Sequence, residues 1–121
     1  MGRFAEAESA FREALRAWEA LPSPPSAEIA ATLNGLGNLL RVEGRYGEAK
    51  QLLRRAISYE EKAGESARLD LAFSLNSLGA LYCNTREPGR ATPLLERGLE
   101  IREAMVGVNH PLVAEQPFRL K

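Results

Sequence analysis

The sequence predicts an all-α fold built from repeated, stacked helical units, and two observations carry this prediction. The chain matches itself at an offset of 42 residues, since Gly2-Arg3-Phe4 recurs as Gly44-Arg45-Tyr46 and Leu33-Asn34 recurs as Leu75-Asn76. Between the breaks, apolar residues recur every three or four positions, which is the spacing of one helix face. A fixed period of this size is typical of a repeat array rather than of one globular core.

The apolar periodicity predicts five helices separated by turn residues. They span about 3–21, 27–42, 46–63, 69–84 and 88–106. Pro22-Ser23-Pro24-Pro25 ends the first helix because proline removes a backbone donor and restricts the residue before it. Ser26 is expected to cap the second helix. Gly44 supplies the next turn, and Gly64-Glu65-Ser66 ends the third helix.

Proline residues lie at or near the predicted starts of the fifth helix and of the segment that follows it. Pro88 suits the first turn of the fifth helix, where its missing N–H matters little. Pro93 lies about a turn further on, so we expect a late start or a small distortion of this helix. A last segment begins at Pro111 and is interrupted by Pro117, which predicts a stub of one or two turns.

Glycine recurs in the middle of two predicted helices, at Gly37 and Gly79. Glycine inside a helix costs about 1 kcal/mol relative to alanine, so its recurrence at one offset needs a reason. Close approach of a partner helix supplies that reason. We expect Ala49 and Ala91 to be the matching small residues on the partner helices.

Composition and charge bound the function. With 121 residues, the chain has room for one domain or one short array. Its 16 basic and 16 acidic residues cancel, which disfavours nucleic acid and acidic membranes as partners. No apolar run approaches the roughly 20 residues needed to cross a bilayer. The N-terminus lacks a signal segment and the single Cys83 cannot form an internal disulfide, so we expect a cytoplasmic protein.

Specific residues resemble the tetratricopeptide repeat family, in the variant found in kinesin light chains. The residues that carry the resemblance are Leu33-x-x-Leu36-Gly37-x-x-Leu40, Gly44-x-Tyr46-x-x-Ala49, Leu53-x-x-Ala56 and Leu75-x-x-Leu78-Gly79-x-x-Tyr82. The resemblance implies a right-handed superhelical array of antiparallel helix pairs, an α-solenoid. It divides residues 1–121, taken as a single array, into a leading second helix (3–21), repeats at 27–63 and 69–106, and a partial repeat at 110–121.

The chain departs from the family pattern at several positions, among them Pro117 where the earlier units have Leu33 and Leu75, and its ends are open. Arg86-Glu87-Pro88 replaces the Gly-x-Tyr turn, and Gly98 stands where alanine is usual. No polar helix closes either end, although repeat arrays normally need one. The chain is therefore interpreted either as a fragment of a longer array or as a small protein whose ends associate.

Catalysis has no candidate residues in this sequence. One histidine and one cysteine cannot supply a metal-ligand set, and nothing resembles a phosphate-binding loop. The resemblance gives His110 a capping or packing role in the loop before Pro111. Glu60-Glu61-Lys62 and Arg54-Arg55 are interpreted as solvated helix faces. We therefore expect no enzyme activity and no cofactor.

The resemblance instead implies a peptide-binding groove, because the first helix of each pair lines a concave surface in this family. Its candidate residues here are Asn34, Asn38, Arg41, Phe73, Asn76 and Asn84, beside Ala31, Ala80 and Cys83. Asparagine amides both donate to and accept from a peptide backbone. Asn34 and Asn76 could equally bridge neighbouring helices or bind water, and Arg41 could pair with a ligand carboxylate or face solvent.

The expected function is a protein–protein interaction scaffold that holds a peptide or protein segment. A lysine-rich carboxylate clamp is absent, which disfavours chaperone C-termini as ligands. The alternative is self-association, in which copies of the chain stack through the open ends. The residues expected at these ends are Phe4, Phe11 and Trp18 at one end and Val113 and Phe118 at the other.

Overall fold

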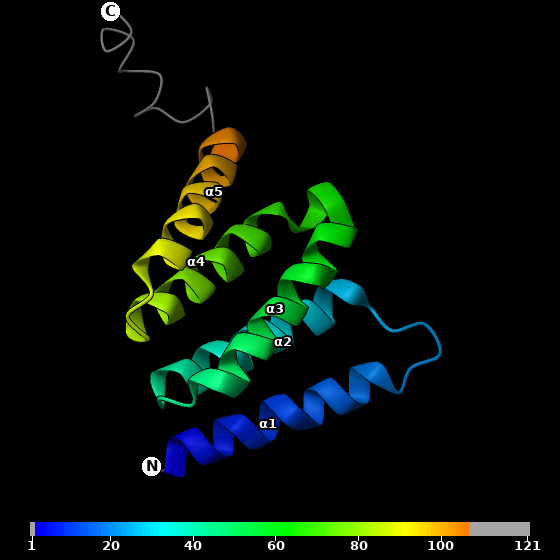
Figure 1. The fold of residues 1–121 in the computed structure, drawn as a ribbon. Helices are drawn as coiled ribbons and strands as arrows, with labels where there is room; N and C mark the ends of the chain where they lie inside the picture. Colours follow the sequence, from blue (N-terminus) through cyan, green and yellow to red (C-terminus); the bar gives the residue numbers. More distant parts are fainter. Residues whose placement is uncertain (1, 107–121) are drawn as a thin grey trace, which may run out of the picture.

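The computed structural model describes residues 2–106, which form five α-helices stacked in chain order (Figure 1). They are α1 (Gly2–Glu19), α2 (Ser26–Val42), α3 (Tyr46–Ala63), α4 (Arg68–Asn84) and α5 (Pro88–Val106), with a short 3-10 helix, η1 (Gly64–Ala67), between α3 and α4. No strand occurs in this part of the chain, so the all-α prediction is confirmed. The stub expected at 110–121 lies outside the described residues.

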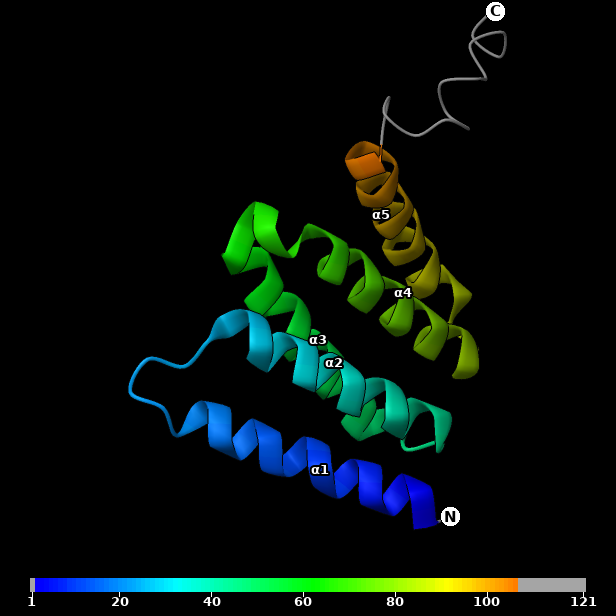
Figure 2. The same ribbon diagram turned by 180° about the vertical axis from the view of Figure 1, so that it is seen from behind.

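The helices pack as neighbouring pairs. α2 packs mainly against α3 and α4 mainly against α5, while α3 against α4 joins the two pairs and α1 covers α2. α4 begins 42 residues after α2, and α5 begins 42 residues after α3. α1 and α5 lie at opposite ends of the stack, and the view from behind places α2 in front of α3 (Figure 2). No helix within residues 2–106 meets the length and apolarity that a membrane span requires.

The core is a layer that continues from pair to pair. Its largest cluster draws buried residues from four helices: Leu36, Leu40, Ala49, Leu53, Leu78, Leu81, Tyr82 and Ala91. A second cluster joins α4 to α5, and a third joins α2 to α3 with Leu15 and Trp18 of α1 packed against it. Each helix thus buries its apolar stripe against the next helix along, as a stacked array requires.

Gly37 and Gly79 allow the close helix contacts that were expected of them. A Cβ on Gly37 would lie 2.8 Å from Leu53 Cγ and 3.4 Å from the carbonyl oxygen of Ala49. A Cβ on Gly79 would lie 2.8 Å from Leu95 Cγ and 3.6 Å from the carbonyl oxygen of Ala91. The expectation is therefore confirmed, and the side chain that presses most closely on each glycine is a leucine.

Arg86 makes the same turn in the second pair that Gly44 makes in the first. Gly44 has φ 86° and Arg86 has φ 63°, both in the left-handed region. In the first turn the Arg45 N–H donates to the Leu40 carbonyl at 2.8 Å, and in the second the Glu87 N–H donates to the Tyr82 carbonyl at 2.7 Å. The departure from the Gly-x-Tyr pattern therefore changes the residue, at a steric cost, but keeps the turn.

One expectation about a helix start is wrong, and another is narrowed to one of its two alternatives. Ser26 is the first residue of α2 rather than its cap, and no side chain caps this helix. The cap is Pro25, whose extended backbone (φ −78°, ψ 112°) lets its carbonyl accept the Ile29 N–H at 3.0 Å. α5 begins at Pro88 as expected, so the late start considered for Pro93 does not occur and Pro93 lies inside the helix. Proline has no backbone N–H, so the Gly89 carbonyl, four residues before Pro93, accepts no helical hydrogen bond from it. Both residues are exposed, so water can solvate this carbonyl.

The expectation that Glu60 is solvated is also wrong, because its side chain is buried. It is 1% exposed, whereas Glu61 and Lys62 beside it are exposed as expected. The Ser74 hydroxyl of α4 donates to Glu60 Oε2 at 3.1 Å. Successive helix residues point about 100° apart, so adjacent acids need not share an environment.

Candidate functional site

The candidate groove residues lie on α2 and α4, which contact one another directly. We call this surface the α2–α4 face; it comprises Ala31, Asn34, Asn38 and Arg41 of α2 and Phe73, Asn76, Ala80, Cys83 and Asn84 of α4. Phe73, Cys83 and Asn84 are exposed, while Asn38, Arg41 and Asn76 are half-buried. Asn34 is buried, at 5% exposed.

Arg41 connects the two helices of this face. Its Nε donates to Asn38 Oδ1 at 3.1 Å, and its Nη1 donates to Asn84 Oδ1 at 2.9 Å. Both partners are neutral amides, and Arg41 forms no ion pair with any carboxylate in residues 2–106. Two amides thus orient a guanidinium whose charge remains available to an acceptor.

Asn34 and Asn76 occupy the same repeat position but differ in their surroundings. Asn34 Oδ1 is buried and accepts no hydrogen bond from the described part of the chain. Asn76 is half-buried, and a Cβ on residue 98 would lie only 3.2 Å from its Oδ1. Gly98, where the family pattern has alanine, therefore leaves room for the Asn76 amide beside α5.

The N-terminal part of α4 gives the face an apolar end. Phe73 is 55% exposed and Leu69, a turn earlier, is 54% exposed. Phe73 and Asn84 are separated by 11 residues on one helix, which corresponds to about 16 Å along its axis at roughly 1.5 Å per residue. The α2–α4 face therefore runs from an apolar end at Phe73 to a cationic, amide-rich end at Arg41 and Asn84.

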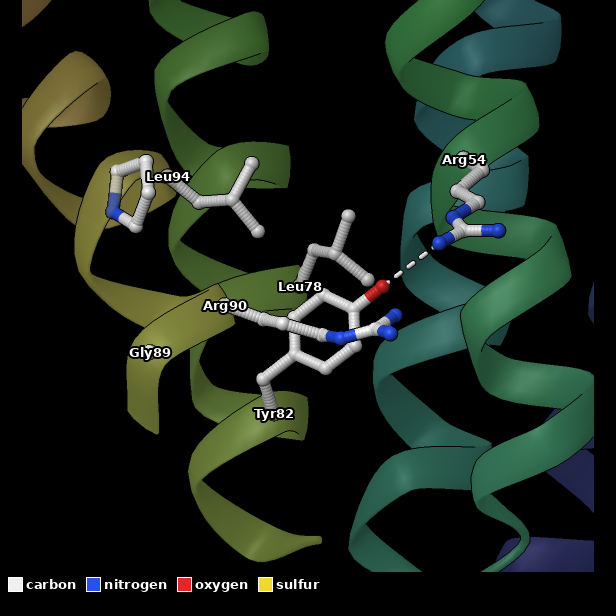
Figure 3. A pocket seen from close by; sticks show the side chains of 7 residues that line it. Arg54, Leu78, Tyr82, Gly89, Arg90 and Leu94 are labelled. Carbon is white, nitrogen blue, oxygen red and sulfur yellow. Dashed lines mark hydrogen bonds between the residues drawn. The ribbon is translucent and has the colours of Figure 1, made fainter. Parts of the chain in front are cut away.

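A hollow that the sequence prediction missed lies between α3, α4 and α5 (Figure 3). It has a volume of about 480 Å³ and is lined by Arg54, Leu78, Tyr82, Gly89, Arg90, Pro93 and Leu94. Arg54 Nη2 donates to the Tyr82 hydroxyl oxygen at 2.7 Å. The prediction missed it because the family resemblance directed attention to the first helix of each pair, whereas most of this lining comes from α3 and α5.

The described residues show no arrangement for metal chemistry. Within residues 2–106 no group of three or more His, Cys, Asp or Glu side chains gathers as a metal site would require. Cys83 is a free, exposed cysteine of the α2–α4 face. The capping role expected of His110 lies outside the described residues.

Comparison with known protein families supports the same assignment as the fold. The family model for the tetratricopeptide repeat matches residues 1–62 and 28–104. The chain belongs to the tetratricopeptide repeat family. Repeats of this family are protein–protein interaction modules and are generally not enzymes. A comparison with curated proteins found no match of significance.

Proposed function

We propose that this chain is an interaction scaffold that binds an extended peptide or protein segment along the α2–α4 face. The observation that carries the proposal is the Arg41 guanidinium, held by amides from two neighbouring helices and not neutralised by a carboxylate of the described chain. In the same proposal the chain is a single array of the kinesin-light-chain type, with repeats at 27–63 and 69–106 and the partial units at 3–21 and 110–121.

The shape of the face suggests the chemistry of the ligand. An extended strand advances about 3.3 Å per residue, so about 16 Å corresponds to roughly five residues. A ligand that places an apolar side chain against Phe73 and a carboxylate against Arg41 would need about that spacing between them. The amide of Asn76, between these ends, would bond the peptide backbone.

Selection of random peptides displayed on phage against the full chain tests this proposal. We expect enriched peptides to carry an acidic residue about five positions from an apolar one. Arg41→Ala and Asn76→Ala should each weaken their binding, by about tenfold for the charged contact, because a hydrogen bond to a charged group contributes about 1.5–3 kcal/mol. Asn34 is not substituted in this test, because it is buried and its replacement would change the stability of the chain as well as its affinity for a peptide.

The control is Arg102→Ala, an exposed arginine of α5 outside the face. Circular dichroism should show unchanged helix content in every variant. Peptides that bind the Arg41→Ala and wild-type chains with equal dissociation constants would rule out the α2–α4 face.

Self-association remains the second candidate, and exposed apolar residues at the two ends of the stack favour it. On α5, Leu99, Met105 and Val106 are 56%, 42% and 41% exposed, and on α1 Phe4 is 37% exposed. Light scattering over a range of chain concentrations separates the two candidates. A mass that rises with concentration supports stacking, and a constant monomer mass rejects it.

The residues expected at these ends need correction. Phe11 and Trp18 are only half-exposed and pack inward on the core, with Phe11 Cε1 2.6 Å from where a Cβ on Gly35 would lie. Only part of each ring is therefore accessible for stacking. Val113 and Phe118 lie outside the described residues.

A further inference from the structure

The hollow beside α4 faces away from the α2–α4 face. Tyr82, in its wall, precedes Asn84 of that face by two residues, so the two side chains point about 200° apart around α4. Its apolar part comes from Leu78, Pro93 and Leu94, and two guanidinium groups, those of Arg54 and Arg90, stand around it (Figure 3). We call it the α3–α5 hollow.

The repeat supplies an internal comparison for this hollow. A smaller hollow of about 150 Å³ lies between α1 and α3 and is lined by Arg12, Glu48, Gln51, Leu52 and Arg55. At the 42-residue offset, Arg12 corresponds to Arg54 and Glu48 corresponds to Arg90. The two hollows therefore share four repeat positions, and at one of these the acid Glu48 is replaced by Arg90.

In the smaller hollow the acid is supplied by the chain itself. Arg12 Nη2 lies 3.4 Å from Glu48 Oε2, and Arg45 Nη2 lies 2.8 Å from Glu48 Oε1. In the α3–α5 hollow, Arg90 takes the position of Glu48, so the lining carries two cations and no acid. The lining of the α3–α5 hollow thus lacks the carboxylate that faces Arg12 in the smaller hollow, and Arg54, the counterpart of Arg12, has no acid beside it in the described part of the chain. The Arg45–Glu48 pair recurs with its charges exchanged, as Glu87 and Arg90.

The polar groups around the α3–α5 hollow are arranged to receive an acceptor. Arg54 forms no ion pair within residues 2–106; its hydrogen bond goes to the Tyr82 hydroxyl oxygen. Because that oxygen accepts from Arg54, the Tyr82 O–H can donate to a ligand. The Arg90 guanidinium carbon lies 5.9 Å from the centroid of the Tyr82 ring, a cation–π distance that holds it over the hollow. Arg90 forms an ion pair with Glu87 through Nε at 3.3 Å, so Arg54 is the cation of this lining that has no acidic partner within residues 2–106.

We propose that the α3–α5 hollow is a second binding site, which takes an aspartate or glutamate side chain from an acidic segment of a partner protein. The carboxylate would lie between Arg54 and Arg90, as Glu48 lies beside Arg12, and a neighbouring apolar side chain would contact Leu78 and Leu94. This site does not depend on the α2–α4 face. A chain with both sites could hold two partner segments at once, one on each side of α4.

The test uses fluorescence anisotropy with the full chain and two labelled peptides, one of alternating glutamate and leucine and one with glutamine in place of glutamate. At low ionic strength, we expect the glutamate peptide to bind at least about tenfold more tightly, because charged hydrogen bonds contribute about 1.5–3 kcal/mol. Arg54→Gln and Arg90→Glu should each remove most of this preference. Arg90→Glu places an acid near Arg54, at the repeat position that Glu48 has beside Arg12.

Two controls separate this site from general charge attraction and from the α2–α4 face. Arg102→Glu makes the same charge change on α5, at an exposed position outside the lining, and should leave the affinity unchanged. All the chains compared in this test also carry Arg41→Ala, so that the charged contact of the α2–α4 face contributes to none of the measured affinities. Equal affinities of the Arg90→Glu and Arg102→Glu chains, or of the two peptides, would overturn the proposal. Competition by inorganic phosphate that greatly exceeds competition by acetate at equal ionic strength would overturn the choice of a carboxylate.

Discussion

Raising the pH from about 5 to about 8 should lower the free energy of unfolding of this chain by about 2–3 kcal/mol through one carboxyl group, that of Glu60. Glu60 is 1% exposed between α3 and α4. Its pKa is raised to about 7, mainly by burial and to a smaller extent by the charge of Asp70, while the hydrogen bond from Ser74 opposes the rise. In the unfolded chain the pKa of this carboxyl returns to its usual value near 4.5.

The direction of the effect follows from proton binding in the two states. Between about pH 4.5 and about pH 7 the unfolded chain has released the Glu60 proton, whereas the folded chain keeps it. The folded state therefore binds more protons, and stability falls as the pH rises through this window. Above about pH 7 both states are ionised at this site, so its destabilising effect no longer grows. Each unit of pKa difference corresponds to about 1.4 kcal/mol.

Glu8 should act in the opposite sense and at lower pH. Hydrogen bonds from Arg45 and Arg12 lower its pKa. Its contribution is therefore present above its usual pKa near 4.5 and is lost as the pH falls further. Because the two windows do not overlap, the fall in stability above about pH 5 reports mainly on Glu60.

Urea unfolding followed by circular dichroism at several pH values measures this effect. Glu60→Gln keeps the shape and an acceptor for the Ser74 hydroxyl, so it should flatten the profile and exceed the wild type in stability at about pH 8 by about 2–3 kcal/mol. Glu61→Gln, at the exposed neighbouring position, should retain the wild-type slope. A Glu60→Gln chain with the wild-type slope would contradict this account.

The sequence alone could predict the helices because each of them carries its own signal. Apolar residues at helical spacing, with proline and glycine between them, define all five helices of residues 2–106. The same pattern also held information about Glu60, which follows Leu53, Ala56 and Ile57 at the spacing of one face. Reading Glu60 and Glu61 together as one solvated acidic run led to the wrong prediction, because neighbours in sequence point to different sides of a helix.

The side-chain geometry of the two surfaces could not be predicted from periodicity. The bond from Arg41 to Asn84 joins helices of neighbouring pairs, so it depends on how those pairs pack. The α3–α5 hollow needs residues of three helices, Arg54, Tyr82 and Arg90, whose proximity no single stripe reveals. Repeat offsets do connect Arg54 with Arg12 and Arg90 with Glu48, but only the structure shows that these positions line equivalent hollows.

Leu53→Ala should cost far more stability than Leu95→Ala, although the two leucines occupy the same repeat position. Leu53 is 0% exposed and lies in the cluster that joins α2, α3, α4 and α5, whereas Leu95 is 37% exposed on α5. Both leucines press on a glycine of the preceding helix, Gly37 or Gly79. Truncation at Leu53 leaves a cavity and should cost about 2–4 kcal/mol. Truncation at Leu95 removes a partly solvated side chain and should cost about 1 kcal/mol or less.

Urea unfolding midpoints at unchanged m-values measure the difference between these two variants. Equal losses of stability in the two variants would mean that the cost of truncating the leucine depends on its position within the repeat. Packing by a further helix on the other side would then contribute little. A large excess at Leu53 would mean the opposite, because interfaces between neighbouring units supply the stability of a stacked array. On that reasoning, a partner that covers the exposed side of α5 should make Leu95→Ala more costly in its complex than in the free chain.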